Sequence, residues 1–457
     1  MSDPRSLSLW LDQLPESLDA RAALAGDTAV DVAIVGGGFT GLWTAYYLLG
    51  LDPSLRVLVV EREICGFGAS GRNGGWCVGE LASRLDSVIE RVGPEVAVRQ
   101  VREVFGAVDE VGRVADVEGI SCGYARGGAV YLARNPAQTS RLRREVEHQH
   151  SLGFTVDEIR WLDPDEARGE VNATDVLGGY RLEPCAALDP AALVRGLADA
   201  VERLGGRIVE QTAARSIAPG HVITDHGVIS ADIVVRATEA YTRSLEGHRR
   251  TLVPLYSLMI ATEPLDRSTW DEIGLARRPT FSDGRHHIIY GQRTADGRLA
   301  FGGRGAPYGY GSRIDPRVEH DSHTHDLIHR TLIELFPPVA GAEITHRWGG
   351  VLAVPRDWQP SVAFDRVTGM ASGGGYVGEG VAASNLAGRT LAELITETES
   401  ERTELPWVGH RSRRWEPEPL RWLGINAGRR IIAAADRVES RTNREAKRAD
   451  WFLKLLR

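Results

Sequence analysis

The spacing of hydrophobic and polar residues changes along this chain, and these changes separate its regions. Short apolar runs of the kind that a buried parallel strand needs occur at 31–35, 56–60 and 232–238. Between 81 and about 117, valines recur three or four positions apart, which predicts helix. From 252 to 345, strand-like runs follow one another with turns between them, which predicts an antiparallel sheet. The pattern therefore predicts an α/β region combined with an α+β region.

The first apolar run leads into a glycine-rich turn that is typical of a dinucleotide-binding βαβ unit. Residues 36–41, Gly-Gly-Gly-Phe-Thr-Gly, fit G-x-G-x-x-G, and the next strand ends in Glu61, twenty residues past Gly41. Gly36 allows the tight turn, Gly38 lets the backbone approach a pyrophosphate, and Gly41 lets helix and strand pack closely. We expect the diphosphate at the helix N-terminus and a ribose hydroxyl on Glu61.

Two further glycine-rich loops follow. Ser70-Gly71-Arg72-Asn73-Gly74-Gly75 comes shortly after the strand that carries Glu61. A loop at this place suits an extended cofactor whose far end runs past it, and it favours FAD over NAD. The third loop, 373–380, precedes a small-residue helix at 381–395. A helix N-terminus aimed at N1 and O2 of a flavin would stabilise the negative charge of the reduced ring.

These motifs resemble those of the flavin-dependent D-amino-acid-oxidase-like superfamily, which includes glycine oxidase, sarcosine oxidase and gamma-glutamylputrescine oxidase. The resemblance covers about residues 29–400. It implies a Rossmann-like FAD-binding domain, an antiparallel-sheet substrate domain and C-terminal helices. The residues that it implies for FAD binding are Gly36, Gly38, Phe39, Thr40, Gly41, Glu61, Arg62, Ser70, Gly71, Arg72, Asn73, Gly74, Gly75, Ala214, Gly375, Tyr376, Val377, Gly378 and Gly380.

The helix–strand unit near Ala214 has two interpretations. Asp189-Pro190 begins a helix that runs to about Leu204, and a strand follows at 207–210. The resemblance implies that this unit contacts the adenine through the backbone around Ala214. A plain crossover unit would have the same sequence pattern.

The predicted domains are discontinuous. The FAD-binding domain is expected to consist of 29–84, 186–246 and 346–400. The substrate domain is expected to consist of 85–185 and 247–345. Residues 401–457 are predicted to form a C-terminal helical tail, and no chemistry is assigned to the leader at 1–28.

The resemblance implies oxidation of the CH–NH bond of a small amine or amino acid to an imine, which water converts to a carbonyl compound. Dioxygen is the expected electron acceptor and hydrogen peroxide the expected product. One alternative is an amine dehydrogenase that passes electrons to a quinone or a partner protein. The other is a non-catalytic, redox-sensing flavoprotein.

A hairpin at 286–304 is the expected place of substrate contact. Asp296-Gly297 between two strand-like runs predicts a two-residue turn, which pairs residues whose numbers sum to 593. Tyr290 then lies opposite Gly303, which leaves room for a ring or ligand. We expect Tyr290 to orient the substrate, although an ordinary strand tyrosine would give the same pattern.

Two other residues of this hairpin are candidates for catalysis or binding. His286 is predicted on the same face as Tyr290, where it could make a polar contact or transfer a proton. Arg304 is predicted on the opposite face. Its forked guanidinium would suit an anionic substrate.

Composition narrows the class of partner. The 457 residues carry a net charge of −8, which argues against nucleic acid as the main partner. The four cysteines show no C-x-x-C spacing, so neither a metal site nor a disulfide framework is predicted. A cytoplasmic protein without a membrane span is expected. His320, His323, His325 and His329 are predicted to face solvent.

The mode of FAD attachment follows from the positions of the cysteines. No cysteine comes after Cys185, which removes the later loops as sites of a cysteine link. Cys65 and Cys77 flank the second glycine loop, so a link there stays open. We expect non-covalent FAD, and the sequence predicts no oligomeric state.

Overall fold

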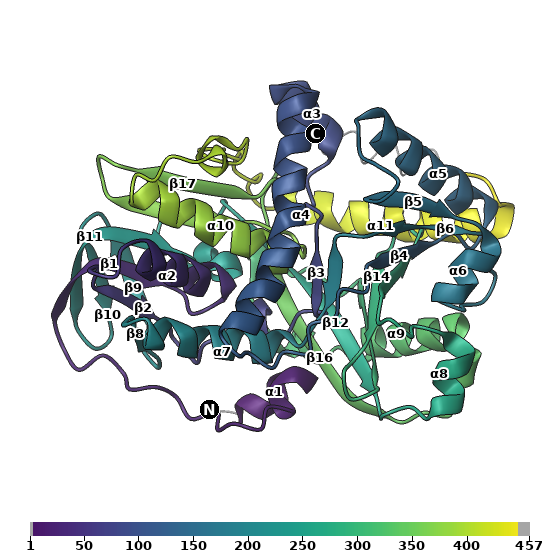
Figure 1. Cartoon of the computed structure of the whole chain (residues 1–457), viewed down its shortest axis with the longest axis horizontal. Helices are drawn as coiled ribbons and strands as arrows, with labels where there is room; N and C mark the ends of the chain where they lie inside the picture. The colour runs from purple at the N-terminus through teal and green to yellow at the C-terminus, as the bar shows by residue number, and fades with distance from the viewer. Residues whose placement is uncertain (1–2, 447–457) are drawn as a thin grey trace.

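The computed structural model describes residues 3–446 and contains two large sheets (Figure 1). The first sheet has a parallel centre in which β1 lies between β11 and β2. Its strands in spatial order are β17 (Ser361–Asp365), β18 (Met370–Gly374), β11 (Val228–Arg236), β1 (Thr28–Val35), β2 (Val57–Val60) and β8 (Arg207–Val209), and β9 (Ala214–Ala218) and β10 (His221–Thr224) pair beside β11. The apolar runs of the sequence therefore form parallel strands, as predicted.

Helices cover one face of this sheet. α2 (Phe39–Leu51) follows the first glycine turn, and α10 (Gly380–Ile395) follows the third glycine loop. The two helices lie against each other at Gly388, where an added Cβ would come within 2.5 Å of the Cβ of Trp43. Small residues on α10 thus allow two helix backbones to approach closely and hold two distant glycine loops side by side.

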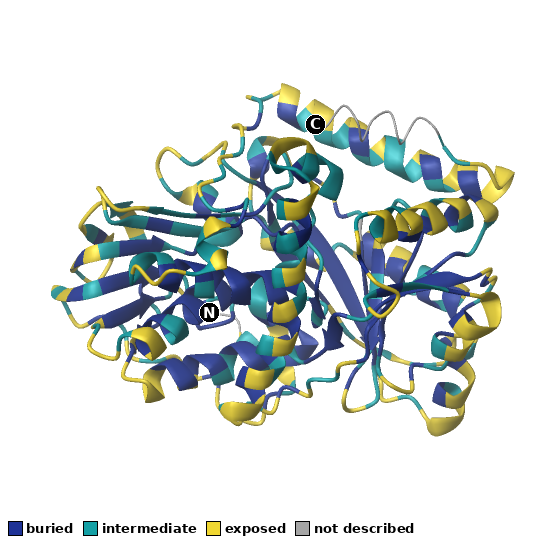
Figure 2. Cartoon of the chain, turned by 45° about the horizontal axis from the view of Figure 1, so that its top comes forward, coloured by how far each residue is buried: buried dark blue, intermediate teal, exposed yellow. Residues whose placement is uncertain are grey.

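The second sheet is mostly antiparallel, as predicted, and draws strands from both segments assigned to the substrate domain. Only β13 and β4 pair in parallel among its described strands. The spatial order is β16 (Ile344–Val354), β12 (Val253–Thr262), β15 (Leu299–Arg304), β14 (Ile289–Arg293), β13 (Thr280–Asp283), β4 (Ala129–Leu132), β6 (Gly179–Leu182) and β5 (Ile159–Leu162). Buried residues gather in the strands of both sheets (Figure 2).

The predicted helical stretch at 81–117 is two helices. α3 (Leu85–Val92) ends at Gly93, whose φ of 85° breaks the helix, and α4 (Pro94–Val117) begins at the next residue. Buried valines of α4 pack with α2, α7 (Pro190–Arg203) and α10 in one hydrophobic cluster. The division into domains stays a proposal, and α4 packs beside the first sheet although 85–185 was assigned to the substrate domain.

The predicted register of the 286–304 hairpin is wrong by one residue. Tyr290 pairs with Gly302, not Gly303, and Ile289 pairs with Gly303, not Arg304. The turn has three residues, because Thr294 N–H donates to the carbonyl of Arg298 at 2.9 Å and Gly297 takes a φ of 82°. The extra turn residue shifts every cross-strand pair by one.

The C-terminal tail contains α11 (Leu420–Thr442), which lies along the second sheet's side of the molecule (Figure 1). Within the described residues, no helix combines the length and apolar character needed to cross a membrane. Residues 447–457, the last part of the predicted tail, lie outside the described residues.

Candidate active site

A cavity of about 410 Å³, which we call the cofactor cavity, lies at the carboxyl ends of β1 and β2 and at the N-terminus of α2. Gly38 is the N-cap of α2 and supplies no capping side chain, but the N–H of Phe39 donates to the Ser70 hydroxyl at 2.9 Å, so the N-terminus is only partly open toward the cavity. Anions bind at such N-termini because unpaired N–H groups and the helix dipole both favour negative charge. The cavity therefore fits a diphosphate at the predicted place.

The glycines of the first loop are required by close backbone approach. An added Cβ at Gly41 would lie 2.0 Å from the carbonyl oxygen of Gly36. Gly36 itself has a φ of 118°, and an added Cβ there would lie 2.4 Å from the carbonyl oxygen of Ala237. A side chain at Gly41 would push α2 away from β1, which is the packing role expected of Gly41, and one at Gly36 would push the turn away from the segment that follows β11.

Glu61 lies at the end of β2 and lines the cofactor cavity. Its carboxylate accepts the N–H of Gly37 at 2.8 Å and the N–H of Glu63 at 2.9 Å. Burial raises the pKa of Glu61 above its usual range. Each carboxylate oxygen keeps acceptor capacity beside its backbone donor, so the residue fits a ribose hydroxyl.

Most of the predicted cofactor residues line this cavity. They are Gly36, Gly38, Phe39, Thr40, Glu61, Arg62, Ser70, Asn73, Ala214, Tyr376, Gly378 and Gly380. The other predicted residues support or adjoin the lining: Gly41, Gly71, Arg72, Gly74, Gly75, Gly375 and Val377. Sequence reasoning missed the lining residues Thr238 and Tyr241, and Tyr241 lies 5.1 Å from the guanidinium of Arg62.

The N-terminal leader, to which the sequence analysis assigned no chemistry, holds the second glycine loop. The Ser8 hydroxyl donates to the carbonyl of Gly71, and the indole N–H of Trp10 donates to the carbonyl of Asn73, both at 2.8 Å. Trp10 is fully buried. A tryptophan in a short apolar stretch was the available signal for this packing.

The same loop contacts the second sheet on its other side. Arg72 forms a buried ion pair with Glu319 at 2.6 Å, so its charge is already paired. An added Cβ at Gly74 would lie 2.7 Å from the ring of Tyr290, and one at Gly75 would lie 2.1 Å from the amide nitrogen of Gln292. These two glycines allow the sheet to approach the loop.

The third glycine loop is fixed by Glu239, which sequence reasoning missed. The N–H of Gly375 donates to the Glu239 carboxylate at 3.0 Å, and Gly375 has a φ of 83°. Burial raises the pKa of Glu239 to about 7. The residues of this loop that line the cofactor cavity are Tyr376, Gly378 and Gly380, which follow Gly375. The hydroxyl of Tyr376 lies 3.0 Å from the hydroxyl of Thr40.

A second cavity of about 240 Å³, the inner cavity, adjoins the first. Ala69, Asn73, Leu352 and Gly378 line both cavities. A cofactor that fills the first cavity would therefore present one end to the second. This junction is the candidate place of reaction.

One face of the second sheet forms the roof of the inner cavity. Tyr180 pairs with Tyr131, Tyr131 with Ser282, and Tyr290 with Gly302 across neighbouring strands. Ser282 also lies beside Tyr290, because Phe281 pairs with Gly291 in the antiparallel β13–β14 pair. These side chains therefore lie on one face of the sheet.

Tyr290 is held firmly in this roof. Its hydroxyl lies 2.8 Å from the hydroxyl of Ser257. Its ring lies over Gly302, where an added Cβ would come within 2.5 Å of it. Tyr290 lines the inner cavity, as its predicted role requires, and the glycine opposite it does leave room for the ring.

The inner cavity is acidic. Its lining includes the carboxyl groups of Glu80, Asp283 and Glu379 and one basic side chain, Arg72, which is paired with Glu319 at 2.6 Å, while Asp283 is ion-paired with Arg285 at 2.7 Å. Glu80 accepts the hydroxyl of Tyr131 at 2.6 Å, and burial raises its pKa to about 8. A positively charged amine beside Glu80 would favour the ionised form of that carboxyl group.

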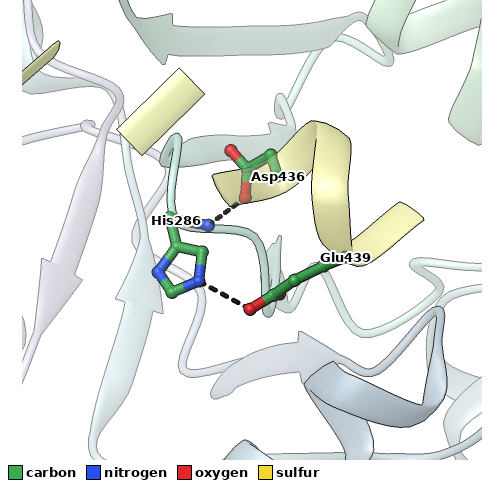
Figure 3. A group of neighbouring side chains, drawn as sticks. All are labelled: His286, Asp436 and Glu439. Atoms are coloured by element: carbon green, nitrogen blue, oxygen red, sulfur yellow. Dashed lines mark hydrogen bonds and ion pairs between the residues drawn. The ribbon is translucent and has the colours of Figure 1, made fainter. Parts of the chain in front are cut away.

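His286 lies apart from the inner cavity lining, in the loop before β14 (Figure 3). Its Nε2 lies 2.9 Å from a carboxylate oxygen of Glu439 on α11, and its backbone N–H donates to Asp436. The structure therefore gives no support to substrate contact by His286. Arg304 ends β15 with its backbone paired to Ser257, and its side chain lies outside the described part of the structure.

His286, Asp436 and Glu439 have the spacing of a metal site, but their atoms already have partners. Glu439 accepts hydrogen bonds from two N–H groups of Arg141, both at 3.0 Å. The guanidinium cation therefore already pairs with the carboxylate that a metal ion would need. Asp436 accepts the backbone N–H groups of His286 and His287. The group therefore attaches α11 to the second sheet.

One predicted solvent-facing histidine is buried. His325 on α9 (Ser322–Leu335) is 1% exposed, and its Nε2 lies 3.1 Å from the carbonyl oxygen of Trp348. Burial lowers its pKa. The prediction failed because successive residues of a helix face different sides, so a polar run along the sequence does not stay on one face.

Comparisons with known proteins agree with the site. The DAO family, described as FAD dependent oxidoreductase, matches residues 31–394. Gamma-glutamylputrescine oxidoreductase of Escherichia coli (strain K12) is 30% identical over 372 residues, which cover 80% of this chain and 83% of that protein. Sarcosine oxidase subunit beta of Rhodobacter capsulatus is 23% identical, covering 80% of this chain and 85% of the relative.

Solved structures show the same fold. The crystal structure of glycine oxidase from Geobacillus kaustophilus superposes with a TM-score of 0.70 at 20% sequence identity, covering 84% of this chain and 99% of that one. The partly open helix N-terminus, the glycine cradle and Glu61 fit the diphosphate and ribose of FAD. The chain belongs to the DAO family of FAD-dependent oxidoreductases.

Proposed function

We propose that this protein oxidises the CH–NH bond of a small amine or amino acid to an imine, which water hydrolyses to a carbonyl compound. Bound FAD supplies the two-electron acceptor, and we further propose that dioxygen reoxidises it with release of hydrogen peroxide. Two relatives support an amine substrate, since they are named gamma-glutamylputrescine oxidoreductase and sarcosine oxidase.

The observation that carries this proposal is the acidic, aromatic-roofed inner cavity beside the cofactor cavity. Its shared lining at Asn73 and Gly378 would bring a bound amine to one end of FAD. Tyr290, fixed by Ser257, would orient that amine. Arg304 would take part instead if the substrate carries a carboxylate.

The acceptor distinguishes an oxidase from a dehydrogenase. The test is to mix purified yellow protein with a panel of amines and amino acids under nitrogen, and then to admit air. Bleaching of the flavin followed by peroxide release supports an oxidase. Bleaching with reoxidation only by a quinone or a partner protein supports a dehydrogenase. A flavin that no amine bleaches would favour a redox-sensing flavoprotein.

We propose that FAD is bound without a covalent link. All four cysteines are buried, and burial raises the pKa of Cys65 and Cys77 well above the usual range, which disfavours the thiolate. Denaturation in acid should release all the yellow colour into the supernatant. Colour retained by the precipitated protein would contradict this proposal.

A further inference from the structure

A third cavity of about 350 Å³, the outer cavity, lies between the second sheet and the helices α3, α4 and α5 (Pro136–Ser151). Glu80 lines both the inner and the outer cavity. Its hydrogen bond to Tyr131 places one carboxyl group at the boundary between them. The function proposed above uses only the inner cavity.

Aromatic rings continue across this boundary. Tyr131, which lines the inner cavity, stacks on Tyr180, which lines the outer one, with ring centroids 4.6 Å apart and an interplanar angle of 18°. Trp76 lies edge-on to both Tyr131 and Tyr290, at 6.3 Å in each case. A carboxyl group among aromatic faces is a typical arrangement for binding an ammonium group.

The outer cavity has a different chemical character from the inner one. Much of its wall is apolar and comes from Val101, Phe105, Phe154, Ile159 and Leu182. Beyond Glu80, its charged side chains are Asp86, which is paired with His148 at 2.9 Å, and the exposed Glu145 and Arg84. Such a wall suits a hydrocarbon chain.

We propose that the inner and outer cavities form one elongated site for a long-chain amine, with the amino group and the carbon bonded to it in the inner cavity, the ammonium group against Glu80, and the rest of the hydrocarbon chain in the outer cavity. This inference rests on the proposed amine oxidation and specifies its substrate class. An ammonium group beside Glu80 would favour the ionised form of its carboxyl group, and the hydrogen bond from Tyr131 fixes the direction of that group. Burying the chain against Phe105 and Leu182 then adds affinity with each methylene.

The test uses the FAD-loaded, full-length protein and a series of primary n-alkylamines from ethyl to octyl. We expect kcat/KM to rise about fourfold per added methylene, the factor that corresponds to burial of one CH₂ group, until the outer cavity is full. If the wild-type protein oxidises short and long amines with equal kcat/KM, the proposal of an elongated site is wrong, although the proposal of amine oxidation is supported. If no amine bleaches the flavin, the proposed function itself fails.

Val101→Phe on α4 should fill part of the outer cavity. We expect it to lower kcat/KM for octylamine at least tenfold and to change kcat/KM for ethylamine less than twofold. Val117→Phe on the same helix is the matched control, because Val117 is 65% exposed, and it should affect neither amine. Equal losses for short and long amines, or no loss for octylamine, would overturn the proposal.

Glu80→Gln keeps a hydrogen-bond acceptor for Tyr131 and removes the charge. We expect KM to rise at least tenfold for every alkylamine in the series, with the FAD spectrum unchanged. Glu147→Gln, at an exposed position of α5, is the control and should leave KM unchanged. An unchanged KM in Glu80→Gln would show that this residue only supports Tyr131, and would overturn its assigned contact with the ammonium group.

Discussion

The cofactor cavity and the inner cavity adjoin, yet they are built from different parts of the protein. The cofactor cavity is formed largely by backbone: the Gly36 turn, the partly open N-terminus of α2 and the glycine loop at 373–380. The inner cavity is formed largely by side chains from separate strands, such as Tyr131, Ser282 and Tyr290.

This difference reflects the chemistry of the two ligands. FAD is a constant cofactor, and its diphosphate is recognised by N–H groups that any sequence of the right backbone shape supplies. A substrate is distinguished by charge, length and shape, which only side chains can vary. We therefore expect changes in the first cavity to abolish cofactor binding and changes in the second to alter kinetics with FAD still bound.

The largest expected effect is loss of FAD in Glu61→Arg. The change removes the carboxylate acceptor at the end of β2, frees the N–H groups of Gly37 and Glu63, and introduces a misplaced charge. FAD binding should weaken by roughly 3 kcal/mol, so the purified variant should be largely colourless.

The control for this prediction is Glu147→Arg, at an exposed position of α5 away from the cofactor cavity. It should stay yellow. A Glu61→Arg protein that is equally yellow, with FAD affinity unchanged by titration, would contradict the assignment of Glu61 to the ribose.

The next effect concerns the side-chain cavity. Once an active amine is known, Tyr290→Phe should lower kcat/KM about tenfold, which corresponds to about 1.4 kcal/mol, with FAD fully bound. The reason is loss of the hydroxyl that Ser257 fixes at 2.8 Å. Tyr310→Phe, at a position 60% exposed, should leave kcat/KM unchanged. Unchanged kinetics in Tyr290→Phe together with a large loss in Arg304→Ala would contradict the role assigned to Tyr290.

Trp10→Phe should have a smaller effect and tests whether the leader supports the cofactor cavity. It removes one buried hydrogen bond to the Asn73 carbonyl, so unfolding free energy should fall by about 1 kcal/mol and FAD affinity a few-fold. Trp270→Phe removes a comparable bond, to the carbonyl of Gly297 at 3.2 Å, away from the cofactor cavity. It should lower stability without changing FAD affinity. Equal FAD affinities in both variants would contradict a role for the leader.

The last prediction concerns the pH dependence of stability. Burial raises the pKa of Glu239 from 4.5 to about 7, so the folded protein keeps a proton there that the unfolded chain has released. Stability from this group is present below pH 4.5 and is lost as pH rises through 7, with a slope of about 1 kcal/mol per pH unit at most.

Glu239→Gln should therefore make the fall in stability between pH 5 and pH 8 shallower, as measured by urea unfolding at both pH values. Exposed Glu246→Gln should keep the wild-type slope. An identical slope in Glu239→Gln would show that Glu239 is ionised throughout this range.

Much of the cofactor cavity can be predicted from local sequence. The Gly36–Gly41 turn, Glu61 and the loop at 373–380 act through local backbone geometry, and local geometry follows from residue type and spacing. The parallel strands, the helix that begins at Pro190 and the small-residue helix α10 were predictable for the same reason.

The other features of the site depend on packing between distant segments of the chain. A three-residue turn in place of a two-residue turn shifts the register of the hairpin by one residue. His286 is held by Asp436 of α11, which lies 150 residues away in sequence. The hydrogen bond between Tyr131 and Glu80, and the one between Trp10 of the leader and the second glycine loop, also join segments that are distant in sequence. No local pattern encodes such contacts, because they depend on which surfaces the whole chain brings together.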